Sequence, residues 1–170
     1  MIILEAEFNY VLRITALIET KTSSKPKWLE MVYDTGAGTT TISRQIALDA
    51  GYKIKTSSDY VDGLGGRVKA DYTVIPNLIL GGVSLGPVYV HVVDFHKELE
   101  RKSSAILSMN VLSWFKITQD CHWNNDLERY DMATLSLEPK YDIKELIKLE
   151  SLLLLNRGQR FGISFVMDKT

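Results

Sequence analysis

Apolar and polar residues alternate in short runs along most of this chain, and polar, glycine or proline segments separate the runs. Alternation with a period of two is typical of half-buried β-strands. It predicts strands over 8–20, 28–33, 53–60, 67–75, 78–80, 83–85, 88–93, 116–120 and 132–137. Helical spacing predicts only two short helices within this part, over 43–49 and 110–115. Many short strands with few helices indicate a mostly β sandwich or barrel.

The last thirty-two positions, 139–170, have a different pattern of apolar and polar residues. Pro139 ends the last predicted strand, and Asp142 with Glu145 has the spacing of a capping box. The apolar positions that follow predict a helix, and alternation over 161–165 allows a final strand. We therefore expect a domain over 1–138 and a C-terminal helical extension over 139–170.

Length and composition set the class of protein. The 170 residues fit one domain with its own core, and 45% hydrophobic with 24% charged residues is ordinary for a globular chain. A net charge of -1 argues against general binding to nucleic acid or a membrane surface. The first residues lack a basic segment, no apolar run is long enough to span a membrane, and the single cysteine, Cys121, excludes an internal disulfide. We expect a cytoplasmic protein.

One stretch, 31–40, combines an apolar strand, a carboxylate and a tight glycine turn. Asp34 stands where the strand meets the turn, followed by Thr35, Gly36 and Ala37. Asp-Thr-Gly is also a good turn sequence without any chemistry, because Asp accepts hydrogen bonds from nearby backbone and Gly tolerates positive φ. The tripeptide alone therefore does not establish a catalytic role.

Two further landmarks follow in order, a glycine-rich tip over 63–66 and an apolar segment with a short helix over 105–112. Together with Asp34 and its turn they resemble the retropepsin-like aspartic proteases, a class of single-domain homodimers. The resemblance covers roughly residues 8–138. It implies a pepsin-like half-lobe, a closed β-barrel with one or two short helices, and an endopeptidase that hydrolyses extended peptides or proteins without a metal or other cofactor.

The resemblance also assigns roles to residues. Asp34 is the catalytic carboxylate, and its partner is Asp34 of a second copy, because the chain holds only one Asp-Thr-Gly. Two adjacent carboxylates share a proton and serve as acid and base. Thr35, Gly36 and Ala37 support the site. The tip formed by Gly63, Leu64, Gly65 and Gly66 is the flap that closes over substrate.

Two positions depart from the family pattern. Ala37 stands where many relatives have Ser, which removes one donor near the carboxylates and leads us to expect activity at mildly acid pH. Ser108 stands where the family has Gly, and its side chain is expected to crowd the strand crossing behind the site. This favours an alternative, a retropepsin-fold homodimer that binds extended peptides with little or no cleavage. Asn110 receives no catalytic role.

Other kinds of site find less support. His91, His96, His122 and Cys121 do not have a standard zinc spacing, so structural or surface roles are expected. No Gly-x-Ser-x-Gly nucleophile motif is present, and no Lys-Ser/Thr follows the glycine tip as a phosphate loop requires. The extension is expected to pack on its own domain or at the dimer interface, with occlusion of the cleft as the alternative.

Overall fold

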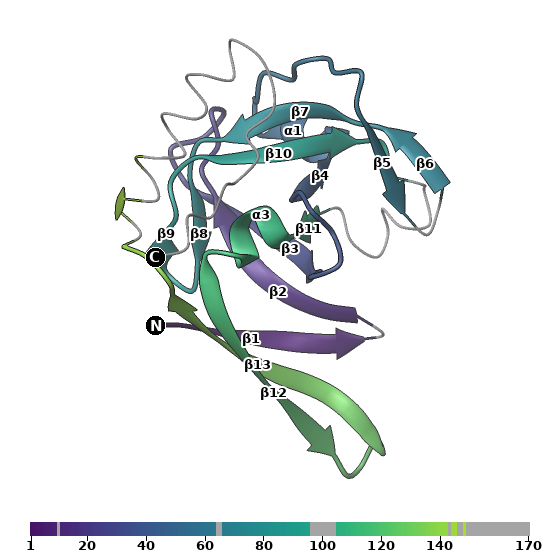
Figure 1. The fold of residues 1–170 in the computed structure, drawn as a ribbon, viewed down its shortest axis with the longest axis vertical. Helices are drawn as coiled ribbons and strands as arrows, with labels where there is room; N and C mark the ends of the chain where they lie inside the picture. Colours follow the sequence, from purple (N-terminus) through teal and green to yellow (C-terminus); the bar gives the residue numbers. More distant parts are fainter. Residues whose placement is uncertain (10, 64–65, 96–104, 143, 146–147, 149–170) are drawn as a thin grey trace, which may run out of the picture.

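The computed structural model describes residues 1–9, 11–63, 66–95, 105–142, 144–145 and 148. These residues form an 11-stranded sheet, a separate two-stranded hairpin and two short helices (Figure 1). The mostly β fold predicted from the sequence is confirmed. Among the described residues the sheet is not closed into the barrel that the resemblance implies. It follows an open path in the order β12-β13-β1-β2-β3-β11-β4-β10-β7, with β8 attached to β2 and β9 to β8.

The elements follow one another closely. They are β1 Ile2–Asn9, β2 Val11–Ile18, β3 Lys27–Tyr33, β4 Thr41–Ser43, α1 Arg44–Asp49, β5 Tyr60–Gly63, β6 Gly66–Lys69, β7 Asp71–Ile75, β8 Leu78–Leu80, β9 Val83–Ser84, β10 Val88–Val93, β11 Ala105–Leu107, α3 Met109–Leu112, β12 Phe115–Asn124 and β13 Arg129–Pro139. Figure 1 shows β7 and β10 at the top, β1, β12 and β13 at the bottom, and β3, β4, β11 and α3 between them.

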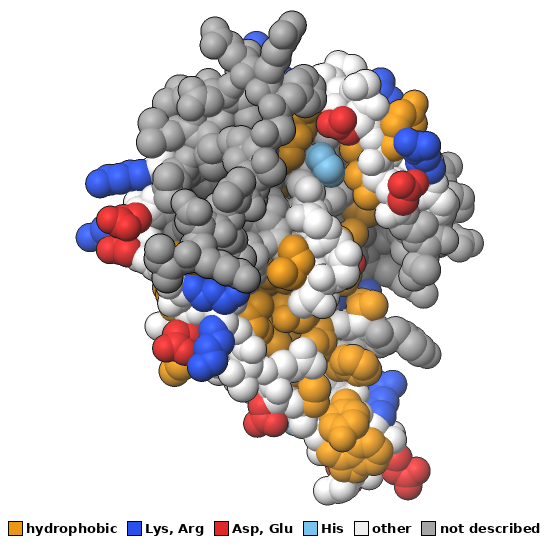
Figure 2. All heavy atoms as spheres, viewed as in Figure 1, with side chains coloured by type: hydrophobic (Ala, Val, Ile, Leu, Met, Phe, Trp, Pro, Cys, Tyr) orange, Lys and Arg blue, Asp and Glu red, His pale blue; other side chains and the backbone are white. Residues whose placement is uncertain are grey.

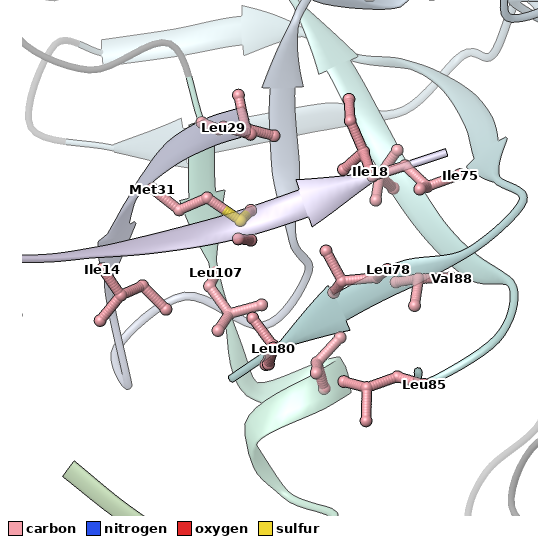
Figure 3. Close-up of a cluster of buried hydrophobic side chains, with 14 of the residues drawn as sticks. Ile14, Ile18, Leu29, Met31, Ile75, Leu78, Leu80, Leu85, Val88 and Leu107 are labelled. Atoms are coloured by element: carbon pink, nitrogen blue, oxygen red, sulfur yellow. The ribbon is translucent and has the colours of Figure 1, made fainter. Parts of the chain in front are cut away.

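The core lies under the middle strands. Every second residue of β2, from Leu12 to Ile18, is buried, as the alternation predicts. Figure 3 shows Ile14 and Met31 of the paired strands β2 and β3 pointing into the same cluster as Leu107 and Leu80. Burial of side chains this large contributes roughly 1.5–3 kcal/mol each. This packing fixes the position of β3 against the core, and Asp34 is the next residue after β3.

Strand β11 lies between two strands that the Asp34 turn connects. It pairs with β3 in parallel, with Leu107 opposite Tyr33, and with β4 in antiparallel, with Ile106 opposite Thr41. The chain must therefore cross from β3 over the end of β11 to reach β4. The residues that leave β11 consequently lie directly beneath the turn over 34–40.

Local signals identify several elements correctly. Ser43 caps α1, since its Oγ accepts a hydrogen bond from the Ile46 N–H at 3.2 Å, and Gly51 follows the helix with φ 71°. Gly81 and Gly82 make the two-residue turn of the β8–β9 hairpin with φ 51° and 79°.

Other elements differ from the prediction. β1 was not predicted, although Ile2, Leu4 and Ala6 alternate and are all buried. Segment 53–60 is not a strand apart from one bridge between Lys55 and Tyr72 and the first residue of β5, because no neighbouring strand pairs with it. The strand predicted over 67–75 is two strands that separate at Ala70.

The sequence predicts strands over 116–120 and 132–137 with a polar loop between them, and the loop is wrong for most of 121–131. β12 and β13 continue through this segment, and only 125–128 form the turn. Exposed polar strands have no alternation of burial, so their sequence resembles that of a loop. The nearly continuous apolar run over 88–93 predicts a strand that is buried on both faces, and this is only partly so for β10. Its Val88, Val90 and Val92 are buried, whereas Tyr89 and His91 are half-buried.

The C-terminal extension lies almost entirely outside the described residues. At its start the Lys144 N–H donates to Asp142 Oδ1 at 2.8 Å, and Lys144 and Glu145 are helical. The packing of the extension therefore stays a prediction. In the part of the chain that the structure describes, no helix has the length and apolar character to span a membrane.

Candidate active site

Asp34 follows the last residue of β3 and is half-buried. Its backbone N–H donates to the carbonyl of Leu107 at 3.0 Å, which continues the parallel pairing of β3 with β11 by one step. The position of the carboxylate is therefore determined by the sheet rather than by a free loop. This rigid support is what a catalytic side chain requires.

The turn after Asp34 is held from beneath by the first residues of α3. The Met109 N–H donates to the carbonyl of Ala37, and the Asn110 N–H donates to the carbonyl of Gly38, both at 3.0 Å. The N–H groups at the start of a helix have no partner within the helix, so the turn satisfies them. The 105–112 segment thus supports the Asp34 turn directly.

Gly36 shapes the carboxylate's surroundings. Its backbone N–H donates to Asp34 Oδ1 at 2.8 Å. A Cβ at Gly36 would lie 3.2 Å from the same oxygen, closer than ordinary contact allows. A side chain here would push the carboxylate out of position. Thr35 is exposed, and Ala37 is half-buried.

Asn110 is the residue that sequence reasoning missed. Its Oδ1 accepts hydrogen bonds from both the N–H and the Oγ1 of Thr40 at 2.7 Å, and its Nδ2 donates to the carbonyl of Tyr89 at 2.9 Å. Thr40 Oγ1 also accepts from the Ser108 N–H at 3.1 Å. One amide therefore connects the end of the Asp34 turn, α3 and β10. No local pattern reveals this, because Thr40 is 70 positions away.

Ser108, the departure noted in the sequence, is fully buried beneath the turn. Its backbone is extended, with φ -132° and ψ -176°, a conformation open to any residue, so the position does not require glycine. Its Oγ, however, has no hydrogen-bond partner among the described residues. The hydroxyl is the unfavourable feature at this position, since a buried unpaired polar group costs about 1–3 kcal/mol.

Replacing this hydroxyl should stabilise the protein. We expect Ser108→Ala to raise the free energy of unfolding by about 1 kcal/mol, because it removes an unpaired polar group without removing a bond. Ser43→Ala is the matched control, since Ser43 is also buried but its Oγ caps α1, and it should lose about 1 kcal/mol. Thermal unfolding of both variants measures the difference. A destabilised Ser108→Ala would show that the hydroxyl has a favourable contact after all.

The hairpin of β5 and β6 stands apart from the main sheet. Gly63 pairs with Gly66, which has φ 97°. Leu64 and Gly65, the other two residues of the predicted tip, lie outside the described residues. The β6 residues are exposed, and Arg67 lies over the Tyr60 ring at 4.6 Å. The flap predicted over 63–66 lies at the end of this hairpin, and its role stays a prediction.

A charged cluster holds the segments at the base of this hairpin. Arg44 of α1 donates from Nη2 to Asp71 Oδ2 at 2.8 Å and from Nε to Asp94 at 3.1 Å. Asp71 Oδ1 accepts from the Ser57 N–H at 3.2 Å, which attaches the segment leading into β5. The hydrogen bond from Arg44 is the main reason why the pKa of Asp71 lies below its ordinary value.

This depressed pKa gives a pH dependence with a definite sign. A carboxylate favoured in the folded state contributes stability above its ordinary pKa, and that stability is lost as pH falls through the folded value. We expect Asp71→Asn to lower the free energy of unfolding by about 1 kcal/mol at pH 6 and by less below about pH 4. Thermal unfolding across pH measures this. Asp94→Asn, at the more exposed partner, should change little, and a pH-independent loss in Asp71→Asn would contradict the assignment.

The histidines and the cysteine considered as metal ligands do not lie together in the described part of the chain. His91 lies on β10, next to Tyr89, whereas His122 and Cys121 lie on β12 at the opposite end of the sheet path. His122 Nε2 is 3.1 Å from Thr134 Oγ1. His96 lies outside the described residues. The described residues hold no group of three or more potential metal ligands.

Comparison with known proteins agrees with this geometry. A family model described as aspartyl protease matches residues 21–111, which include Asp34, the β5–β6 hairpin and the start of α3. A retropepsin-like aspartic protease from Rickettsia conorii has a similar structure, with TM-score 0.52 and 17% identity over 78% of this chain and 89% of that one. At this identity the similarity concerns the fold. A comparison with curated proteins gives no match.

Two further solved structures are more distant. The EIAV protease in complex with the inhibitor HBY-793 has TM-score 0.46 and 20% identity, covering 61% of this chain and 86% of that one. The retroviral protease-like domain of Ddi1 from Leishmania major has TM-score 0.42 and 12% identity, covering 78% and 97%.

Proposed function

Because this chain belongs to the aspartyl protease family, with a retropepsin-like fold, we propose that it is an endopeptidase that acts as a homodimer. The observation that carries the proposal is Asp34 itself. It lies at the end of β3, with the Gly36 N–H on one carboxylate oxygen and the turn fixed by Met109 and Asn110.

One carboxylate cannot perform the reaction alone. Hydrolysis by water needs a base that takes a proton from the water and an acid that protonates the carbonyl oxygen of the peptide. Two carboxylates close together share a single proton, and so one is base while the other is acid. The chain has one Asp-Thr-Gly, so the second carboxylate is Asp34 of another copy, placed by a twofold axis.

The steps follow from this arrangement. The ionised carboxylate takes a proton from the water as its oxygen attacks the peptide carbon, and the protonated carboxylate gives its proton to the carbonyl oxygen. The tetrahedral intermediate then collapses and the C–N bond breaks: the carboxyl that took the water proton gives it to the leaving nitrogen, and the other carboxylate takes a proton from a hydroxyl of the intermediate. The products are a new carboxyl and a new amine. The apparent pKa values of such a pair belong to both groups together.

The surrounding residues would serve this chemistry in specific ways. The exposed Thr35 hydroxyl lies next to Asp34, where it can bond to the second copy beneath the two carboxylates. The β5–β6 hairpin would close over an extended substrate and exclude water. The substrate would add as a β-strand, so its backbone provides affinity and its side chains provide specificity.

A mixture of unrelated peptides tests the proposal. Purified protein is incubated with the mixture from about pH 3 to pH 7, and new termini are identified by mass spectrometry. Internal cleavage with an optimum at mildly acid pH supports the proposal. Peptide binding without cleavage at any pH would instead support the alternative, a retropepsin-fold protein that binds extended peptides.

A further inference from the structure

A hollow of about 190 Å³ opens on the surface where segment 53–55 meets β7. It is called the lysine hollow here, and the residues that line it are Lys21, Lys53, Lys55, Tyr72, Thr73 and Val74. They come from three separate parts of the chain, namely the connection between β2 and β3, the connection between α1 and β5, and β7 itself. Figure 1 shows the connection between α1 and β5 passing along β7.

The lining of the lysine hollow holds three positive charges and no negative one. Lys21, Lys53 and Lys55 are exposed, and in the described part of the chain none of their ammonium groups has an ion pair or hydrogen bond. Lys55 Nζ lies 5.8 Å from the centroid of the Tyr72 ring. By contrast, Figure 2 shows positive and negative side chains interspersed over the face it presents. Like charges around one hollow repel one another, and an anion between them turns this repulsion into attraction.

A backbone donor lies at the same place. Tyr72 exchanges both of its backbone hydrogen bonds with Lys55, at 2.8 and 3.0 Å, so these groups point away from β10. The N–H of Val74, two residues further along β7, points to the same side. The residue opposite it is Lys53, whose carbonyl instead accepts from Thr73 Oγ1 at 3.0 Å. The Val74 N–H is thus left without an acceptor among the described residues.

We propose that the lysine hollow binds an oxyanion with two or more negative charges, either a phosphate or a polycarboxylate. Ammonium groups and backbone N–H groups are the donors that recognise such anions, and their hydrogen bonds to ionised oxygens are the strong ones. A water molecule takes about 30 Å³ in the liquid. The hollow therefore has room for an anion of several heavy atoms, such as pyrophosphate or citrate.

A bound anion would join the two segments that carry the β5–β6 hairpin. Segment 53–55 leads toward β5, and β7 follows β6 after Ala70, so the lysine hollow lies at the base of the hairpin. A ligand that contacts both segments stabilises the state in which they lie together. If the hairpin closes over substrate, the anion would then regulate that closure, and this consequence alone rests on the proposed function.

Calorimetric titration of the whole chain tests the binding. Orthophosphate, pyrophosphate and citrate are titrated separately at one low ionic strength, because salt screens exposed charges. At least one of them should bind saturably, with one anion for each chain. The triple variant Lys21→Gln, Lys53→Gln, Lys55→Gln should raise its dissociation constant at least tenfold, since charge-assisted hydrogen bonds are lost. Binding of the phosphates alone assigns the hollow to phosphate groups, and binding of citrate as well assigns it to polyvalent oxyanions in general.

A second triple variant controls for the loss of charge. Lys116→Gln, Arg129→Gln, Lys140→Gln removes the same number of positive charges from exposed positions in or next to β12 and β13, at the opposite end of the sheet path from β7. It should bind the anion as the wild type does. Equal losses in the two variants would show a response to net charge alone and overturn the proposal, as would a wild-type chain that binds none of the three anions. Arginine at the three positions of the hollow should preserve binding, and circular dichroism checks that each variant is folded.

The Val74 amide gives a readout in the wild-type protein. In isotope-labelled chain its N–H resonance should shift during the pyrophosphate titration, with the same midpoint as calorimetry, because the N–H gains an acceptor. The N–H of Thr73 is directed to the opposite edge of β7, toward β10, and should move less. A Val74 resonance that stays in place while the anion binds would put the site elsewhere and overturn the proposal.

The outcomes separate this proposal from the proposed function. Asp34 is not part of the lysine hollow, so Asp34→Asn should bind the anion as the wild type does. A chain that binds the anion but cleaves no peptide supports the hollow and overturns the endopeptidase, whereas a chain that cleaves peptides and binds no anion does the reverse. If both proposals hold, saturating pyrophosphate should change KM more than kcat in the wild type and neither in the triple Gln variant of the hollow. An equal response in both chains would overturn the link to the hairpin.

Discussion

Asp34→Asn is expected to abolish peptide-bond cleavage while the chain stays folded and dimeric. The substitution removes both the base and the acid, since each copy contributes one carboxylate, and acid–base catalysis of this kind is worth roughly 10²–10⁴-fold for each group. The fold should survive because an amide has nearly the shape of a carboxylate and its oxygen still accepts the Gly36 N–H. Glu138→Gln, at an exposed carboxylate of β13, is the control and should keep full activity. Cleavage that persists in Asp34→Asn would contradict an aspartic mechanism.

Mixing the inactive and wild-type chains tests whether the catalytic unit is the pair. If copies exchange freely, an equal mixture contains active pairs as only about one quarter of its dimers, because both members must be wild type. If each chain acted alone, about half of the activity would remain. The measurement is a titration of Asp34→Asn protein into a fixed total concentration of chain. A linear rather than quadratic decline would show that one Asp34 is sufficient.

The parts of this fold that were predictable are those determined by nearby residues. The Ser43 cap, the Gly81–Gly82 turn and the Asp34 turn each arise from a few adjacent side chains and their backbone. β1 was predictable in principle, since its buried residues alternate, but Glu5 and Glu7 on its exposed face make the segment more polar.

The parts that were not predictable depend on partners far along the chain. Segment 53–60 has the composition of a strand and is not one, because strand formation needs a neighbour that pairs with it. Segment 121–131 shows the opposite. Its composition is mostly polar, which is typical of a loop, yet β12 and β13 stay paired as far as Asn124 and Arg129. At the site, Asp34 was identified from its motif. Asn110 was missed because its three partners come from Thr40 and Tyr89.

Asn110→Ala is expected to weaken both the fold and the catalysis. The change removes two hydrogen bonds that Thr40 donates and one that Tyr89 accepts, and it leaves these groups partly buried without partners. At about 1 kcal/mol for each bond, the free energy of unfolding should fall by roughly 2–3 kcal/mol, which thermal unfolding measures. Because Thr40 ends the turn that begins at Asp34, the carboxylates should also lose their alignment. A misplacement of about 1 Å is enough to lower kcat by roughly 10²-fold.

A matched variant separates positioning by Asn110 from simple loss of stability. Asn77 Oδ1 accepts from Ser84 Oγ at 2.7 Å and from the Gly86 N–H at 3.1 Å, so Asn77→Ala removes a similar set of bonds around the β8–β9 hairpin, away from the Asp34 turn. Both variants should unfold at lower temperature, but only Asn110→Ala should lose kcat when assayed well below its unfolding transition. Asn110→Asp keeps an acceptor for Thr40 and loses the donor to Tyr89, so its kcat should fall between the two. Equal kcat in Asn110→Ala and Asn77→Ala would show that Asn110 stabilises the fold without aligning Asp34.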